Sequence, residues 1–328
     1  MKYCEHIAHT ISFNEKDILP CCTPGGYNPP SYYNSRLESH NIVSSIDIDK
    51  KQEEAFKILN SKEIEKWSCK NCLFCKEVAE MPKDENKINS IFLRQWIKDD
   101  ITDEDCSLPI NYDAYELIKK MYESGKIDVE KLTVRMQSMD LSSIPDFDKY
   151  LDLFEQYGAQ AIHVSTDNIV YNEKLAKLMK EQKASINICL DSGTKEMYQL
   201  IKKADNFDSI IENLKKYADT TGDSDVGICI HYVLQKNVND NKKEIDSFLN
   251  LMRTIGIKNI GIRINGETLN SFLTGKDTNI LDYKNLITYF YEEANKNGFE
   301  LDNDSCIEQN FILEKKPAKK GFFAKIFG

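Results

Sequence analysis

The stretch Ile186-Asn187-Ile188-Cys189-Leu190-Asp191-Ser192-Gly193-Thr194-Lys195-Glu196-Met197-Tyr198 holds the clearest change from strand to helix in the chain. Its first part is a short apolar run, which is typical of a buried strand, and Ser192-Gly193-Thr194 supplies turn residues before a helix. A second helix follows, because apolar residues recur there at helical spacing. These residues are Phe207, Ile210, Ile211, Leu214 and Tyr217.

The same alternation of strand and helix continues on both sides of this stretch. Strands are predicted at residues 88–96, 132–137, 161–165, 185–190, 226–234 and 258–264. Helices are predicted at residues 112–124, 145–157, 172–181, 195–201, 207–218, 242–255 and 283–297. Such repeats predict parallel strands joined by right-handed crossovers. The fold class is therefore α/β, a partial (βα)6 TIM-like barrel, with an open sheet as the alternative. In both cases ligands bind at the C-terminal ends of the strands.

Three regions of different texture are predicted along the chain. Residues 1–86 form a loop-rich, cysteine-rich segment with many Pro and Gly residues and one helix at 50–59. Residues 87–300 form the βα barrel, and residues 301–328 are a C-terminal extension that ends in a basic, aromatic tail. A segment as irregular as the first has little core of its own, so metal ligation would stabilise it.

Composition excludes several classes of function. The 328 residues are 41% hydrophobic and 29% charged, which is ordinary for a globular protein. The net charge of −10 argues against nucleic acid as a partner, because phosphate binding needs a basic surface. No run of 18 apolar residues and no apolar signal-peptide core is present, so we expect a cytoplasmic protein.

Ten cysteines in a reducing compartment indicate metal binding more than disulfides. Cys69, Cys72 and Cys75 are each separated by two residues, a spacing that lets thiolates face one metal or cluster. Such a site needs about four ligands. The predicted metal ligands are therefore Cys4, Cys21, Cys22, Cys69, Cys72 and Cys75. His6 and His9 are alternative ligands beside Cys4, and iron–sulfur and zinc both remain open. Cys189 and Cys229 lie in apolar strands and are predicted core residues.

Several sequence motifs in the chain resemble motifs of radical SAM proteins in their order and spacing. They are the stretch from Ile186 to Tyr198, the helix with Glu212-Asn213-Leu214, and Asn239-Asp240-Asn241 after the next strand. The resemblance covers about residues 88–265. The cysteines of the N-terminal segment resemble the auxiliary-cluster (SPASM or twitch-like) cysteines of the same superfamily, although those follow the barrel in many members.

The resemblance implies an iron–sulfur cluster, expected to be 4Fe–4S, and S-adenosylmethionine as cofactors. It also implies which strand ends would contact S-adenosylmethionine. Those positions are Ser138, Asp140, Ser165, Asn168 and Asp191. The chain departs from the family after its first barrel strand, where members carry CxxxCxxC. Only Cys106 is found there, in an acidic loop, and the glycine-rich phrase after the second strand is replaced by residues 137–145.

Three functions are compatible with this pattern. The first is an iron–sulfur protein that has lost its catalytic cluster and acts as a partner or electron-transfer subunit of an unknown protein or peptide. The second is an active radical enzyme whose cluster is held by Cys69, Cys72 and Cys75. The third is a zinc-stabilised binding protein. The tail at 315–328, with four apolar side chains among lysines, predicts a weak contact with an anionic membrane surface or a partner groove.

Overall fold

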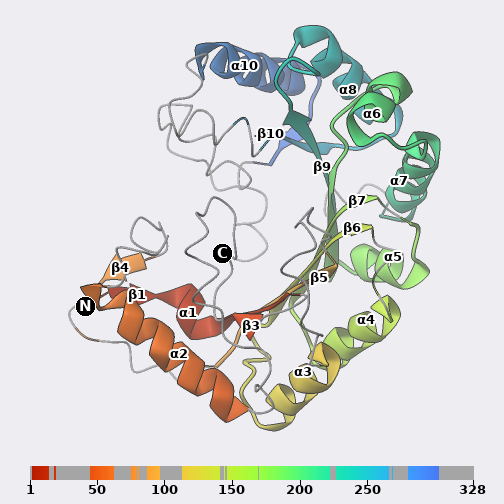
Figure 1. Ribbon diagram of the computed structural model, residues 1–328. Coiled ribbons are helices and arrows are strands. Elements are labelled where there is room, and N and C mark those ends of the chain that lie inside the picture. The colour runs from red at the N-terminus through yellow and green to blue at the C-terminus, as the bar shows by residue number, and fades with distance from the viewer. Residues whose placement is uncertain are drawn as a thin grey trace. The chain divides into compact units, whose positions relative to one another are not determined.

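The computed structural model describes a large part of the chain, shown in Figure 1. The described residues are 2–14, 18–19, 45–62, 75–78, 80, 87–96, 113–140, 144, 146–168, 170–221, 227–265, 268 and 280–302. They fall into two compact units, Met1–Ser165 and Thr166–Gly328. Strand β7 (Ala161–Asn168) runs across the division.

The first unit is built on parallel strands. Strand β5 (Ser90–Trp96) lies between β2 (Thr10–Asn14) and β6 (Thr133–Asp140) and is parallel to both. Strand β3 (Ile18–Leu19) pairs with the outer edge of β2 in the antiparallel direction. Helix α3 (Ala114–Glu123) connects β5 to β6, and α4 (Phe147–Gln156) connects β6 to β7.

A small N-terminal layer belongs to the same unit. Strand β1 (Lys2–Cys4) and β4 (Cys75–Glu77) form an antiparallel pair. Helix α1 (Glu5–His9) links β1 to β2, and α2 (Ser45–Leu59) packs against α1. The buried side chain of Gln52 on α2 fixes this packing, since its Nε2 atom donates to the carbonyls of Ile7 and Ala8 at 2.9 Å.

The second unit continues the same plan. Strands β8 (Ala184–Cys189), β9 (Ile228–Leu234), β10 (Asn259–Ile264) and β11 (Glu300–Leu301) are parallel in that order. Helix α5 (Glu173–Lys180) precedes β8, and α6 (Lys195–Lys202) and α7 (Phe207–Thr221) precede β9. Helices α8 (Lys242–Thr254) and α10 (Ile280–Lys296) lead to β10 and β11.

Helix starts in this fold are set by capping side chains. Asp113, Asn172, Thr194 and Asn241 each precede a helix and accept a hydrogen bond from the backbone N–H three residues later. Each of these contacts satisfies one of the N–H groups that the first helical turn leaves unpaired. The caps explain why the sequence changes from strand to helix at these points.

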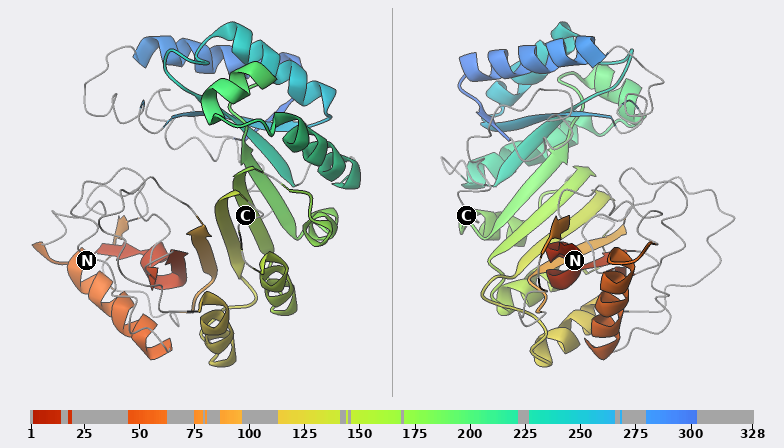
Figure 2. Two further views of the ribbon diagram at one scale, coloured as in Figure 1. Left: turned by 45° about the vertical axis from the view of Figure 1, so that its right-hand side comes forward. Right: turned by 90° about the vertical axis from the view of Figure 1, so that its left-hand side faces the viewer.

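The strands of the second unit have two chemically different faces. One face carries Ile230, Tyr232 and Ile262, which are fully buried, and it packs against α8 and α10 through the rings of Phe248 and Phe290. Figure 2 shows these two helices, coloured cyan to blue, on the same side of the strands. Side chains alternate between the two faces along a strand, so the neighbours of these residues in the sequence point to the opposite face. That opposite face is polar: it carries Asn187, Cys189, Cys229, His231, Asn259 and Arg263.

The predicted α/β class is confirmed, and the order of elements gives the six βα units of a partial TIM-like barrel. All six predicted strands are present as β5 to β10, and the predicted helices are present within a few residues. The N-terminal segment differs from the expectation of little core. Its strand β2 extends the parallel sheet, and Ile11 and Phe13 on that strand are buried.

The boundaries predicted at residues 86 and 300 stay a prediction, and the tail at 315–328 lies outside the described residues. Within the part of the chain that is described, no helix combines the length and the apolar composition that a membrane span requires.

Candidate functional site

The first site suggested by the sequence is the cysteine centre. In the β1–β4 pair, Cys4 and Cys75 are direct Cα partners. The cysteine nearest the N-terminus and the last cysteine of the CxxCxxC run therefore occupy opposite positions on two paired strands. The backbone of Cys75 is described but its side chain is not, and Cys21, Cys22, Cys69 and Cys72 lie outside the described residues.

Cys4 is the last residue of strand β1. Its side chain is buried and forms a small cluster with Ile7, Ala55 and Leu59, and Phe56 packs against them. The ring of Tyr3, the residue before it, stacks on Phe56 with 5.8 Å between ring centroids. The surroundings place Cys4 on a fixed backbone between β1 and α1.

His9 has other partners than a metal. Its Nδ1 atom lies 3.0 Å from the carbonyl of Lys87, and its Nε2 atom lies 3.3 Å from the hydroxyl of Tyr3. Both ring nitrogens therefore have hydrogen-bond partners, one in the chain before β5 and one on β1. This arrangement favours cysteines over His9 as ligands beside Cys4.

The strand ends expected to contact S-adenosylmethionine are found in both units. Ser138 is buried near the end of β6, and Ser165 is half-buried on β7. Asp140 and Asn168 end these same two strands, but their side chains are not described. Asp191 follows β8 in the second unit. Their roles stay predictions.

Asp191 is the best defined of these positions. It has a left-handed backbone with φ 61°, which is uncommon outside glycine and often found where a side chain must be aimed. Its buried carboxylate lies 3.0 Å from Nζ of Lys202, the last residue of α6. Gln235, just after β9, approaches the same carboxylate oxygen at 3.5 Å. A charged pair thus sits at the C-terminal ends of β8 and β9, where α/β folds bind ligands.

Asn239 ties these two strand ends together. Its Nδ2 atom donates to the carbonyls of Asp191 and Val233 at 2.7 and 2.9 Å. Its Oδ1 atom accepts from the backbone N–H of Gln235 at 2.7 Å. The side chain is fully buried, so all these groups would lack water if the amide were removed.

Replacing Asn239 by alanine should therefore lower the free energy of unfolding by about 2–3 kcal/mol, because it leaves buried carbonyl and N–H groups unpaired. Urea unfolding followed by circular dichroism measures this loss. Asn250→Ala on the exposed face of α8 is the control, with a change within about 0.5 kcal/mol. Equal stability of the Asn239 and Asn250 variants would show that Asn239 does not hold the strand ends.

The turn between Asp191 and α6 is shaped by close packing. Ser192 bonds to the backbone of Thr194 through its hydroxyl, and Thr194 caps α6. Gly193 lies directly against the backbone of α8 at Ser247 and Phe248, where a Cβ atom would overlap the helix. This turn, Asp191-Ser192-Gly193-Thr194, therefore packs β8 and α6 against α8, and its Asp191 is also a candidate ligand contact.

A histidine in the first unit gives this fold a pH dependence. Burial and, to a smaller extent, the charge of Arg135 lower the pKa of His163 on β7 to about 4. The folded state therefore favours the neutral ring, while the unfolded chain protonates near pH 6.5. The stabilising contribution is complete above about pH 6.5 and is lost as the pH falls towards 4.

We expect this loss to be about 1–3 kcal/mol, discounted because the ring is only half-buried. The measurement is the urea midpoint of the protein and of His163→Gln at pH 7 and pH 5. Stability should fall less in the variant over this range. An identical fall in both proteins would mean that other groups cause it.

Sequence patterns missed one further group of side chains. Cys229 is buried, as predicted for a core residue, but it lies beside two residues that the sequence alone does not single out, His231 and Asp302. The signal for the first pair was present, since residues two apart on a strand share a face. Asp302 comes from a distant segment, and only the fold brings it to β9.

Comparisons with known proteins give likenesses of fold. No known family and no curated protein matches the sequence. Among solved structures, SuiB from Streptococcus suis is similar with a TM-score of 0.41 and 12% identity, over 59% of this chain and 44% of SuiB.

Two further structures give similar values. A radical SAM methyltransferase from Sphaerobacter thermophilus has a TM-score of 0.34 and 14% identity, over 58% of this chain and 55% of that protein. Native anSMEcpe with bound AdoMet has a TM-score of 0.38 and 18% identity, over 57% of this chain and 53% of that protein. The matches thus span about half the length of these proteins.

Proposed function

We propose that this chain is an iron–sulfur protein related to radical SAM proteins, with its cluster held by cysteines of residues 1–86. We further propose that it acts in the cytoplasm as a partner or electron-transfer subunit. The observation that carries the proposal is the pairing of Cys4 with Cys75 in the β1–β4 register. This pairing brings a cysteine from the start of the chain next to the CxxCxxC run, and cysteines that bind one cluster together must lie close to one another.

The type of donor fits such a cluster. Cysteine thiolates are the usual ligands of iron–sulfur clusters, and a reducing compartment keeps them available. A cluster bound here would supply one-electron transfer. The chain contributes the fixed position of Cys4, which is set by burial against α1 and α2. The remaining thiolates of a four-ligand site would come from among Cys21, Cys22, Cys69, Cys72 and Cys75.

The partner role rests on the residues that come after strand β5. Members of the resembled superfamily place three cysteines there, whereas this chain has only Cys106 in an acidic loop. Too few thiolates among several carboxylates disfavour assembly of a second cluster at that strand end. If S-adenosylmethionine does bind, we propose that Ser138, Asp140, Ser165, Asn168 and Asp191 contact it.

The test is to reduce the anaerobically purified protein and incubate it with S-adenosylmethionine. The proposal predicts an electron paramagnetic resonance signal from a reduced cluster and no cleavage of S-adenosylmethionine. Cleavage that is lost in Cys72→Ser would instead support an active enzyme with Cys69, Cys72 and Cys75 as ligands. Zinc without any cluster signal would support a zinc-stabilised binding protein.

A further inference from the structure

A second group of ligand-type side chains lies in the second unit, far along the chain from the cysteine run. Cys229 and His231 stand two residues apart on β9 and therefore share its polar face. Asp302 directly follows β11, and its backbone N–H donates to the carbonyl of Ile260 at 2.9 Å. This bond continues the β10–β11 pairing, so Asp302 is held beside β10 by the sheet itself.

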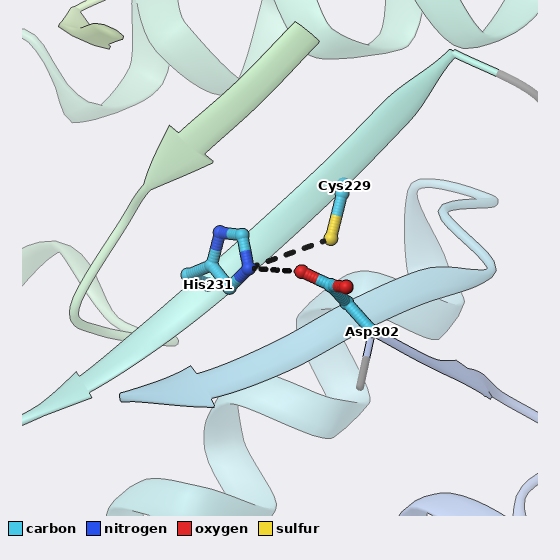
Figure 3. A group of neighbouring side chains, drawn as sticks. All are labelled: Cys229, His231 and Asp302. Carbon is cyan, nitrogen blue, oxygen red and sulfur yellow. Dashed lines mark hydrogen bonds and ion pairs between the residues drawn. The ribbon is translucent and has the colours of Figure 1, made fainter. Parts of the chain in front are cut away.

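The three side chains converge on one point, as Figure 3 shows. Nε2 of His231 lies 2.8 Å from Oδ2 of Asp302 and 3.7 Å from Sγ of Cys229. One nitrogen, one oxygen and one sulfur atom thus lie within 4.8 Å of one another. All three residues are buried, and His231 has no exposed surface.

Hydrogen bonds to Asp302 join both His231 and the Cys229 thiol, but Nε2 of His231 is more crowded than one hydrogen bond requires. A ring nitrogen carries either one hydrogen or one lone pair, so Nε2 can serve one close contact in any protonation state. Yet Cys229 and Asp302 both approach this atom, and Nη2 of Arg263 lies 3.5 Å from it as well. A cation at the convergence point would accept a lone pair from each of Sγ, Nε2 and Oδ2.

A nucleophilic relay does not account for this arrangement. In a Cys–His–Asp relay the thiol and the carboxylate contact different nitrogens of the imidazole ring. Here both contact Nε2, so the ring does not lie between the thiol and the carboxylate (Figure 3). The arrangement is that of ligands around a common centre.

We propose that Cys229, His231 and Asp302 form a second metal site, which binds a Zn²⁺-type ion. Mixed sulfur, nitrogen and oxygen ligands suit zinc. For tetrahedral zinc, the S–N separation is about 3.5 Å and the N–O separation about 3.4 Å. The observed 3.7 Å needs almost no change, and the 2.8 Å contact must open by roughly half an ångström.

The residues around the three ligands determine the space and the charge next to such an ion. Gly261 is the Cα partner of His231 on β10, so no side chain from that position competes for the space. Arg263 adds a positive charge next to the site. The Cys229 thiol would release its proton when the ion binds, so that its thiolate and the Asp302 carboxylate would then supply two negative charges. Three protein ligands leave a fourth position for water or a ligand group, as catalytic zinc sites do.

The test is a metal count on the full chain and on Cys229→Ala, His231→Gln and Asp302→Asn. Each protein is equilibrated with zinc without oxygen, freed of unbound metal, and analysed for zinc, iron and sulfide. We expect each variant to hold one zinc fewer per chain, with iron and sulfide unchanged. Asn250→Ala on the exposed face of α8 is the control, since it lies away from the three ligands in the sequence and should keep the zinc.

The expected difference does not depend on the N-terminal cysteines. If those cysteines bind zinc in place of iron, all counts rise together and the difference of one remains. Added zinc should also raise the melting temperature of the unaltered chain more than that of any variant that keeps its circular dichroism spectrum. Equal zinc in the chain and in its folded variants, or equal loss in Asn250→Ala, would overturn the proposal and leave a buried His–Asp–Arg hydrogen-bond network.

Discussion

Replacing Gly193 by alanine should destabilise the second unit by about 3 kcal/mol or more. The added Cβ would overlap the backbone of α8 at Ser247 and Phe248. Backbone atoms in the middle of a helix cannot rotate away, so the whole helix must move. That movement would disturb its buried face, which consists of Glu244, Ile245, Phe248, Leu249 and Met252.

The measurement is urea unfolding of Gly193→Ala and of a matched glycine variant, Gly298→Ala. Gly298 has φ 76° and no atom within 4 Å of an added Cβ, so its substitution reports only the cost of a left-handed backbone, about 1 kcal/mol. Gly193→Ala should lose clearly more. A loss at Gly193 no larger than at Gly298 would contradict the close contact with α8.

Replacing Cys4 by serine should remove most of the bound iron and sulfide. Serine keeps the size of the side chain but is a far poorer ligand for iron than a thiolate. Since Cys4 is the Cα partner of Cys75, its loss would remove the cysteine that the β1–β4 pairing brings to the CxxCxxC run. Iron and sulfide per chain after anaerobic purification, together with the absorption spectrum, measure the effect.

Cys189→Ser is the control for Cys4→Ser, because it removes a thiol from the second unit and should leave iron and sulfide unchanged. Full iron in Cys4→Ser would contradict the role of Cys4 as a ligand and would identify it as a core residue of the α1–α2 layer.

Much of the fold could be predicted because its elements carry local signals. The helices α6 and α8 begin directly after Thr194 and Asn241, residue types that are preferred at helix N-caps. Strand β9 is mostly apolar apart from His231, and six of its seven residues are buried. Strands β2 and β11 were not predicted, because they are short and are stabilised by hydrogen bonds to the neighbouring strands β5 and β10.

The candidate sites were predictable only in part, for the same reason. Asp191 could be predicted from its place at a strand end, but its ion pair with Lys202 depends on how α6 folds back. The Cys229–His231 spacing was visible in the sequence. Asp302, which completes that group, is brought there by the pairing of β11 with β10.

The central claim is that the N-terminal cysteines hold an iron–sulfur cluster. Counting iron, sulfide and zinc in the full chain, purified without oxygen, tests it most directly. We expect about four iron and four sulfide per chain, as a 4Fe–4S cluster contains. Zinc in stoichiometric amount with no sulfide would contradict it and leave a zinc-binding protein on a βα fold.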